Sequence, residues 1–408
     1  MNNRALNLNR LISQRGYSGL SLFTLLVALP VLFLTFAFAS AASAQDEDAA
    51  AQDEGAAAQE NDAVPSADSD SGAGNQDETE VPGPGSVRQL FVREGSGVPN
   101  EVREIYDRGA MYLAESQNEE GGFTNGQNGI VGLALMAFLS TGEDPNFGRY
   151  AINIRRACRY LILRQAESTG YIGDSMYDHG FAMLALSEAY GAVDDELVWA
   201  GYDGGRKRTI GEALELCVRL AQTAQTKNSD GGWRYSPNDA TADTSVSGAV
   251  LMGLLAARNA GIAVPDSVID RALEYFKSMT SEGGTVAYAG LGGLGDSMAR
   301  SSIACLVYCI GKRKDWEEFE SVRGYLVDNI ERQESGWEYY FRYYMAQALF
   351  QADYEAWEQW NSTVIDLIRD RQNEDGSVSG GSHGPVYSTS MSLLALALNY
   401  KFLPIYER

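Results

Sequence analysis

Two kinds of hydrophobic pattern alternate along residues 88–408. In the first kind, apolar residues follow the i, i+3, i+4, i+7 spacing of one helix face, as in residues 210–224, where Glu212, Glu215 and Arg219 lie off that face. In the second kind, the residues are small or apolar all round, as in "VSGAVLMGLLAA" and "STSMSLLALAL". The first pattern predicts helices with one exposed side, and the second predicts helices that are buried on most sides.

Glycine turns separate the two kinds of helix at nearly regular intervals. The markers are Gly122, Gly170, Gly232, Gly284, Gly336 and Gly376, at intervals of 48, 62, 52, 52 and 40 residues. The longest interval contains the insert "AVDDELVWAGYDGGRKRT", so the repeat is close to 50 residues long. Short connections favour antiparallel neighbours. We therefore predict an all-α fold, an (α/α)6 toroid in which six outer/inner helix hairpins close into a ring.

Each turn has a predicted architectural role. Glycine permits the left-handed backbone that is expected to end the outer helix. The aromatic residue that follows is Phe123, Tyr171, Trp233 or Trp337, and we expect it to cover the turn and pack on the adjacent repeat. A buried aromatic side chain of this kind contributes about 1.5–3 kcal/mol.

The first 44 residues are typical of a leader. Three arginines precede an apolar run at residues 20–39, and Ala42 and Ala44 occupy the small-residue positions of a signal-peptidase site. Residues 1–44 are therefore predicted to be a signal peptide, cleaved before Gln45. An uncleaved N-terminal anchor is the alternative, because about 20 apolar residues can span a bilayer. We expect an exported protein of the periplasm, cell envelope or exterior. It contacts the membrane only if the N-terminal segment is not cleaved.

Residues 45–87 hold 12 acidic residues, no basic ones and few large apolar ones, which predicts an acidic disordered linker before a toroid domain at 88–408. The leader carries +3 and the linker −12 of the total charge of −23, which leaves −14 on the domain. An acidic domain is a poor partner for nucleic acid or anionic lipid headgroups.

The turn motifs resemble those of a known family. "QNEEGGF" (117–123), "QNEDGS" (372–377) and "DGGWRYSP" followed by "DTSVSGAVLMGLLAA" are similar to the Gln-…-Gly-…-Trp repeats of the terpenoid cyclase and protein prenyltransferase superfamily, also called prenyltransferase/squalene oxidase repeats. The resemblance covers about residues 100–405. "MYDHGFAMLALSEAYG" and the closing "YSTSMSLLALALNYKFLPIYER" resemble secreted bacterial members with a single toroid and undefined activity. The resemblance implies the toroid fold rather than an activity.

In a toroid, the N-terminal ends of the inner helices open on one mouth of the central cavity, so polar and aromatic residues there are the candidates for ligand binding. We expect the cavity to be lined by Tyr177, Thr244, Asp296, Arg300, Tyr340, Arg342, Tyr343 and Tyr387. Tyrosine faces can stabilise a cation, stack on a sugar or hold an acyl chain. The alternative is an aromatic core that fills the ring, with phenol groups at its wet edge.

Asp243 is the first candidate catalytic residue. "ADTS" at an inner-helix start resembles the Asp-Thr part of the acidic motif of squalene-type cyclases, in which an aspartic acid protonates an alkene. That chemistry needs a protonated carboxyl group in a water-poor site. The consecutive aspartates of the motif are missing, since Asp239 is four residues away. The alternative is that Asp243 only caps the helix that begins at Thr244.

His179 and Asp178 are the other catalytic candidates. His179 is one of two histidines, with His383, and both stand near the start of an inner helix. A histidine there can act as a general acid or base. The alternative is a hydrogen-bonded structural histidine, with Asp178 simply favouring the helix N-terminus.

Neither a metal nor a cofactor is expected. Protein prenyltransferases hold zinc with an Asp-x-Cys pair and a histidine, but no Asp-x-Cys occurs here, and Cys305 and Cys309 fall in mid-helix. Protein prenyl transfer is therefore not expected. Four cysteines are too few for a disulfide framework, and a pair between Cys158 and Cys217 stays open.

Three functions remain open from the sequence. The first is an exported toroid that binds an apolar or amphipathic ligand, such as an isoprenoid, or an envelope protein partner, without catalysis. The second is a terpenoid cyclase-type isomerase or lyase with Asp243 as the acid, although large triterpene cyclases use two helical domains. The third is a polysaccharide lyase or hydrolase, with paired carboxylates drawn from Asp178, Asp243 and Asp296.

Overall fold

The computed structural model describes residues 98–123, 127–205, 207–290, 295–334, 336–400, 403 and 405. The chain divides into two compact units, residues 1–82 and 83–408. All described residues belong to the second unit. The predicted signal peptide (1–44) and acidic linker (45–87) lie outside the described residues, and so does the start of the predicted domain.

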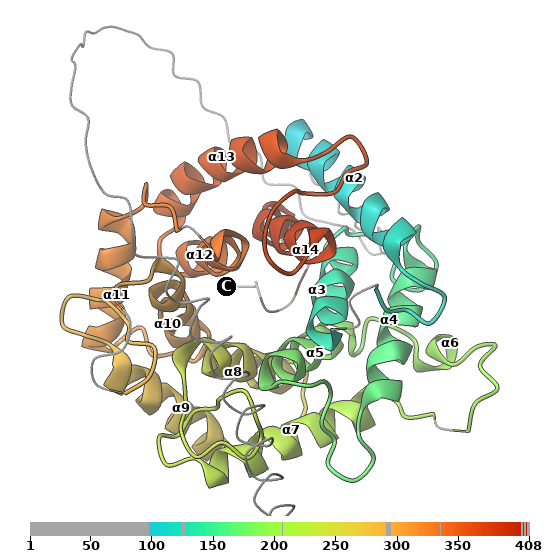
Figure 1. Ribbon diagram of the computed structural model, residues 1–408, viewed down its shortest axis with the longest axis horizontal. Helices are drawn as coiled ribbons and strands as arrows, with labels where there is room; N and C mark the ends of the chain where they lie inside the picture. Colours follow the sequence, from blue (N-terminus) through green and yellow to red (C-terminus); the bar gives the residue numbers. More distant parts are fainter. Residues whose placement is uncertain are drawn as a thin grey trace, which may run out of the picture. The chain divides into compact units, whose positions relative to one another are not determined.

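The helices of the second unit form two concentric rings (Figure 1). The outer ring consists of α2 (Asn100–Ser116), α4 (Ala151–Arg164), α7 (Ile210–Lys227), α9 (Asp266–Met279), α11 (Glu317–Asp328) and α13 (Tyr354–Arg371). The inner ring consists of α3 (Asn128–Leu139), α5 (Met176–Ala189), α8 (Thr244–Asn259), α10 (Met298–Ile310), α12 (Glu338–Ala352) and α14 (Pro385–Leu396). The 3-10 turn η1 (Ala397–Asn399) follows α14, and α6 (Asp195–Val198) lies in the predicted insert.

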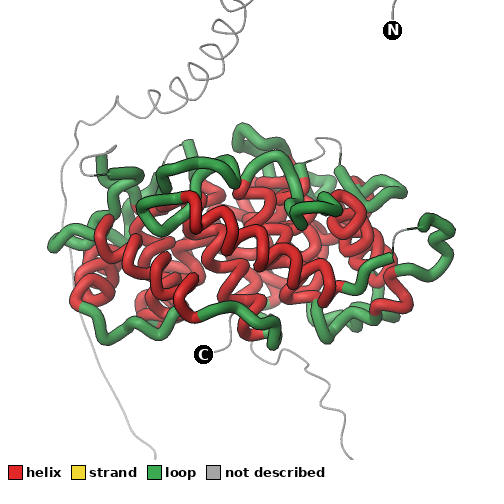
Figure 2. Tube along the Cα trace, turned by 90° about the horizontal axis from the view of Figure 1, so that it is seen from below, coloured by secondary structure: helices red, strands yellow, loops and turns green. Residues whose placement is uncertain are grey.

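Seen from the side, the helices lie between two rims of loops (Figure 2). Along the chain each outer helix is followed by an inner one, and α14 packs against both α2 and α3, so the last hairpin meets the first. The predicted all-α fold of six outer/inner hairpins closed into a ring is confirmed.

The burial of the helices follows their hydrophobic patterns. Every residue of α8 from Val246 to Ala257 is buried, whereas α7 buries one face and begins with a capping box made by Thr209 and Glu212. Glycines let the inner helices approach closely: a Cβ on Gly132 of α3 would lie 2.7 Å from the carbonyl oxygen of Phe181 on α5. The small residues of the inner helices thus allow backbone-to-backbone packing around the ring.

Glutamines near the ends of four outer helices join each of these repeats to its neighbour. The Nε2 atoms of Gln117, Gln165, Gln225 and Gln372 each donate to the carbonyl group of their own glycine turn and to a carbonyl group of the next outer helix. For Gln225 the acceptors are Gly231 O at 2.7 Å and Val268 O at 2.9 Å. Gln372 donates to Ile105 O of α2 at 2.8 Å and so closes the ring.

The glycine turns differ from the prediction. Helix α7 ends at Lys227, and its next residue is extended, so the left-handed Gly231 (φ 98°) belongs to the turn that follows. The prediction that glycine ends the outer helix is therefore wrong. In the first and third turns the left-handed residue is the first glycine of the pair, Gly121 or Gly231. The second glycine provides space instead, because a Cβ on Gly232 would lie 2.3 Å from Ser247 Oγ.

All four cysteines are buried free thiols, so Cys158 and Cys217 are not bonded to each other. Cys305 and Cys309 lie within α10, as expected. Among the described residues, no helix is both long and apolar enough to cross a bilayer. The apolar run at residues 20–39 lies outside that part of the chain.

Candidate functional site

The N-terminal ends of inner helices α8 and α12 are joined across one mouth of the ring. The N–H of Thr244, at the start of α8, donates to Tyr288 O at 2.9 Å, in the loop before α10. The hydroxyl of Tyr340, in the first turn of α12, donates to Ser245 O at 3.3 Å. Because α10 lies between α8 and α12 in the inner ring (Figure 1), this second bond spans the mouth.

Asp243 is the N-cap of α8 and is completely buried. Its Oδ1 accepts the N–H of Val246 at 2.8 Å, which confirms the expected capping role. Its Oδ2 is also buried and has no hydrogen-bond partner among the described residues. Burial raises the pKa of this carboxyl group to about 7, although the N–H of Val246 and the charge of Arg234 act in the opposite direction. Near neutral pH, Asp243 therefore exists as a mixture of acid and carboxylate.

Tyrosine rings surround Asp243 at this mouth. The ring centroid of Tyr177, in the first turn of α5, lies 6.2 Å from that of Tyr340 and 6.1 Å from that of Tyr235. The hydroxyl oxygens of Tyr235 and Tyr288 are 2.9 Å apart. Burial raises the pKa values of Tyr177 and Tyr288, and the nearby charge of Asp243 raises them further. Tyr235 and Tyr288 were not predicted as site residues from the sequence, although both follow a glycine turn by three or four residues, the one signal that could have found them.

His179 and Asp178 each connect their helix α5 to a neighbouring helix. The Nδ1 of His179 accepts the N–H of Ile172 at 3.3 Å, so its Nε2 carries the proton and donates to Cys217 O of α7 at 3.1 Å. Burial lowers the pKa of His179 to about 4, which keeps the ring neutral. The Oδ1 of Asp178 accepts the N–H of Gly129 of α3 at 2.8 Å. Both side chains thus bind backbone groups of the inner and outer rings.

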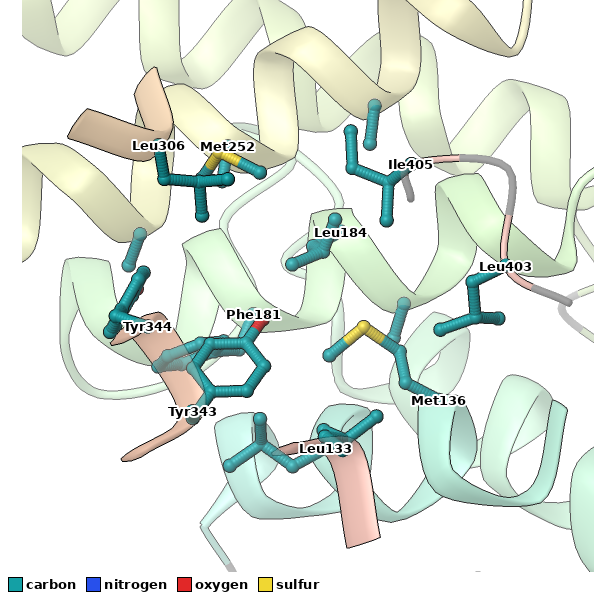
Figure 3. Packing of buried hydrophobic residues seen from close by; sticks show 14 of the residues in the cluster. Leu133, Met136, Phe181, Leu184, Met252, Leu306, Tyr343, Tyr344, Leu403 and Ile405 are labelled. Carbon is teal, nitrogen blue, oxygen red and sulfur yellow. The ribbon is translucent and has the colours of Figure 1, made fainter. Parts of the chain in front are cut away.

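None of four other expected cavity residues, as far as the structure describes them, is hydrogen-bonded to Asp243 Oδ2. Thr244 donates through its hydroxyl to Ala287 O at 2.9 Å, and Arg300 donates through Nε to Val286 O at 2.9 Å, so both hold the loop before α10. Asp296 is exposed in that loop. Tyr343 is buried among the side chains at the ring centre (Figure 3).

A small hollow lies beside this mouth, between the starts of α12 and α14. Its volume is about 10 Å³, which is room for about one water molecule. It is lined by Gly336, Trp337, Glu338, Tyr339, Tyr340, Gly381, Ser382, His383 and Tyr387. His383 packs between Trp337 and Tyr387, with ring centroids 5.9 and 5.0 Å away. Tyr340 therefore borders both the hollow and the tyrosines around Asp243.

Arg342, also expected in the cavity, lies behind this hollow. It is only 3% exposed and donates through Nη2 to Glu338 Oε2 at 3.1 Å. Arg342 was expected to lie among tyrosines, whereas Glu338 and Trp337 were not predicted as site residues. In the sequence, Trp337 resembles the aromatic residues that follow the other glycine turns. Its exposed fraction of 39% is visible only in the structure.

Side chains fill the centre of the ring. Figure 3 shows them converging from five inner helices and the end of the chain: Leu133, Met136, Phe181, Leu184, Met252, Leu306, Tyr343, Tyr344, Leu403 and Ile405. Each is at most 5% exposed. Ile405 is further held by a bond from its N–H to Glu188 Oε2 at 3.4 Å. The space that was expected to be a central cavity is thus occupied by side chains.

Metal ligands are not gathered in the described part of the chain: no group of three or more His, Cys, Asp or Glu side chains there is arranged to hold an ion.

Comparison with known proteins relates the chain to others by structure. No family model matches it, and no curated protein matches it. The α-1,6-mannanase GH76A from Salegentibacter sp. HEL1_6 matches with a TM-score of 0.53 and 11% identity over 72% of this chain and 98% of that one. A family 76 glycoside hydrolase from a bovine Bacteroides thetaiotaomicron strain matches with a TM-score of 0.54 and 9% identity over 73% and 77%. The chain is an α/α toroid.

A further match to this toroid is the type II terpene cyclase MstE from Scytonema, in complex with geranylgeranyl dihydroxybenzoate. Its TM-score is 0.48, with 14% identity over 74% of this chain and 98% of the cyclase. At these identities the likeness shows the fold alone. The expected α/α toroid architecture is confirmed, and the activity is left undefined.

Proposed function

We propose that this toroid is exported and binds an amphipathic ligand at the tyrosine-lined mouth of its ring, without converting it. The observation that carries the proposal is the contrast between the filled ring centre and the mouth. There Tyr177, Tyr235, Tyr288 and Tyr340 offer ring faces to an apolar body and hydroxyl groups to polar ones.

Export rests on the sequence of residues 1–44, and it places the ligand or a protein partner in the cell envelope or outside the cell. An isoprenoid with a polar head is one ligand that suits such a mouth. The charge of −14 on residues 88–408 speaks against nucleic acid as a partner.

Glycan cleavage has less support. It requires two carboxyl groups held about 5–10 Å apart across a cleft. Of the three carboxylates considered, Asp178 is bonded to the backbone of α3 and Asp296 is exposed in a loop. The mannanase and the family 76 glycoside hydrolase share the fold, but their activity does not transfer to this chain at 9–11% identity.

One observation favours a cyclase-type alternative. Asp243 is a buried acid with a raised pKa and an unbonded oxygen, which is the state needed to protonate an alkene. Against it, a polyprene needs a long apolar cavity, and the ring centre is occupied by side chains.

The test is native mass spectrometry of the protein purified from the envelope of its own cells, followed by identification of what it releases. We expect an amphipathic molecule that the double variant Tyr177→Ala/Tyr340→Ala no longer retains. The exposed residue Phe147, in the loop before α4, provides the control, Phe147→Ala, which keeps the ligand. Release of a cyclised product that disappears in Asp243→Asn would overturn the proposal in favour of the cyclase.

A further inference from the structure

Helix α4 differs in charge from the other outer helices. It contains no acidic residue and four arginines, Arg155, Arg156, Arg159 and Arg164, so its net charge is +4. The other outer helices, α2, α7, α9, α11 and α13, each carry a net charge between 0 and −3. Positive charge is thus concentrated on one helix of a domain whose net charge is −14.

Three of these arginines lie on one stripe of the helix surface. Residues 152, 155, 156 and 159 follow the i, i+3, i+4, i+7 spacing of a single helix face, and none of them is buried. Ile152 is 57% exposed and lies at the N-terminal end of the stripe. The outer face of α4 therefore offers solvent three cationic side chains with an apolar side chain at one end.

Within the described part of the chain, none of the arginines of α4 forms an ion pair with a carboxylate. Arg155 donates through Nε to the carbonyl oxygen of Ala151 at 3.1 Å. The guanidinium group of Arg159 lies over the ring of Tyr202 at 5.7 Å. Partial burial and the charges of Arg156 and Arg155 lower the pKa of Arg159, as is expected where like charges are close together.

Cations elsewhere around the ring have carboxylate partners. Arg313 pairs with Asp270 at 2.6 Å, and Arg323 pairs with Glu320 at 2.9 Å. These pairs occupy the guanidinium groups with groups of the same chain. The arginines of α4 keep their capacity to bind carboxylates.

The insert that lengthens one interval of the repeat supports this face. Its helix α6 packs against α4 and lies outside it in the ring (Figure 1). Trp199 follows α6, has its ring centroid 5.4 Å from that of Tyr202 and donates to Arg208 O at 2.9 Å. Arg208 in turn donates to Gln165 Oε1, directly after α4, at 2.7 Å. The insert thus places an aromatic ring beneath Arg159, which orients that side chain without cancelling its charge.

The cationic surface is narrow. The first glycine turn packs against the backbone of Arg156 and carries the exposed Glu119 and Glu120. The neighbouring helix α7 exposes Glu212 and Glu215. A nucleic acid or an anionic membrane is wider than one helix and would meet these carboxylates as well, since charges repel over about 8 Å at physiological salt. A short acidic segment can contact the arginines alone.

We propose that the outer face of α4 is an interaction surface for a short acidic segment of a partner protein, with Arg155, Arg156 and Arg159 as donors. The guanidinium fork matches the two oxygens of a carboxylate. Ile152 gives a protein segment an apolar side chain to cover, which a phosphate polymer does not use. The surface lies on the outer wall of the ring, so the inference does not depend on the proposed function of the mouth.

The experiment is isothermal titration with a glutamate peptide of about six to eight residues, which spans the length of α4 when extended, and with the matching glutamine peptide. The protein is the full chain with the acidic residues of 45–87 replaced by Asn and Gln, so that they do not compete with the peptide. We expect the glutamate peptide to bind at least about tenfold more tightly than the glutamine peptide, because several exposed ion pairs act together.

Matched variants in this parent separate the surface from general charge effects. Arg155→Gln/Arg156→Gln removes two charges from the stripe and should remove most of the preference for the glutamate peptide. Lys277→Gln/Arg323→Gln removes two charges from α9 and α11, on the far side of the ring, and should change binding by less than about twofold. Salt at about 1 M should abolish the preference in the parent, which tests the surface without any variant.

Each outcome decides the proposal. Equal binding of the two peptides, a preference that survives high salt, or parental binding by a folded Arg155→Gln/Arg156→Gln variant refutes the surface. A loss of the same size in Lys277→Gln/Arg323→Gln also refutes it, because the effect then belongs to the total charge. Vesicles of phosphatidylglycerol provide the last comparison. If they bind through Arg155 and Arg156 while the glutamate peptide does not, the face contacts lipid and the proposal falls.

Discussion

Asp243 performs two roles that oppose each other. As an N-cap it accepts an N–H bond most strongly when it is charged, but its complete burial favours the neutral form. The capping role was predictable from "ADTS" before an apolar helix. Its burial was not, because it depends on loops carrying Tyr235 and Tyr288, whose contacts arise only when the repeats pack.

The pKa of Asp243 predicts a pH-dependent stability. The folded value of about 7 lies above that of an unfolded aspartate, about 4, so the folded state binds the proton more tightly. Its stabilising contribution is complete below pH 4 and is lost as the pH rises through 7. Asp243→Asn keeps a cap but does not titrate, so at pH 8 it should be more stable than the parent, by up to about 4 kcal/mol.

The measurement is urea unfolding of both proteins from pH 4 to pH 8, with the exposed Asp266→Asn on α9 as control. The gap between Asp243→Asn and the parent should widen as the pH rises, and the control should show no such trend. A gap that does not change with pH would show that Asp243 has an ordinary pKa.

At the scale of elements, glutamines near the ends of four outer helices link each of these repeats to the next, a role that the glycines marking the repeats in the sequence do not have. The helix pattern and turn spacing predicted every outer and inner helix, because each hairpin repeats the same periodicity. The bond from Gln225 to the next repeat could not be predicted from this periodicity, because its acceptor, Val268 O, belongs to that repeat. In the fifth repeat an exposed Trp337 departs from the pattern, and it lines the small hollow between the starts of α12 and α14.

Gln225→Ala should destabilise the toroid by about 1–3 kcal/mol, because it leaves the buried carbonyl groups of Gly231 and Val268 without their donor. Gln222→Ala, on the exposed side of the same helix, should change the free energy of unfolding by less than about 0.5 kcal/mol. Chemical denaturation of both variants provides the comparison. Equal effects would mean that the two-way bond contributes nothing beyond helix propensity.

At the scale of the whole molecule, the toroid is a closed ring with a packed centre. The closure followed from the count of hairpins and the short connections. The packed centre did not, because it depends on which side chains from five inner helices converge, and on Leu403 and Ile405 from beyond the last helix. Apolar patterns show that a residue is buried, but not whether it borders a void.

Deleting residues 401–408 removes Leu403 and Ile405 from that centre. We expect the loss of each buried side chain to cost about 2–5 kcal/mol and to leave a dry apolar void. The neutral probe diphenylhexatriene should then become fluorescent in the truncated protein but not in the parent. Phe147→Ala, in the exposed loop before α4, serves as the unchanged reference. A truncated protein with parental stability and no probe signal would show that these residues add little to the packing.

The bond between Gln372 and Ile105 joins groups 267 residues apart. A chain emerging from a ribosome or a translocation channel must therefore hold its first hairpin with one flank uncovered until nearly all of the sequence has appeared. During that interval two unfinished chains can cover each other's exposed flanks by exchanging hairpins. Crowded synthesis should accordingly yield intertwined dimers, and slow synthesis should yield single closed rings.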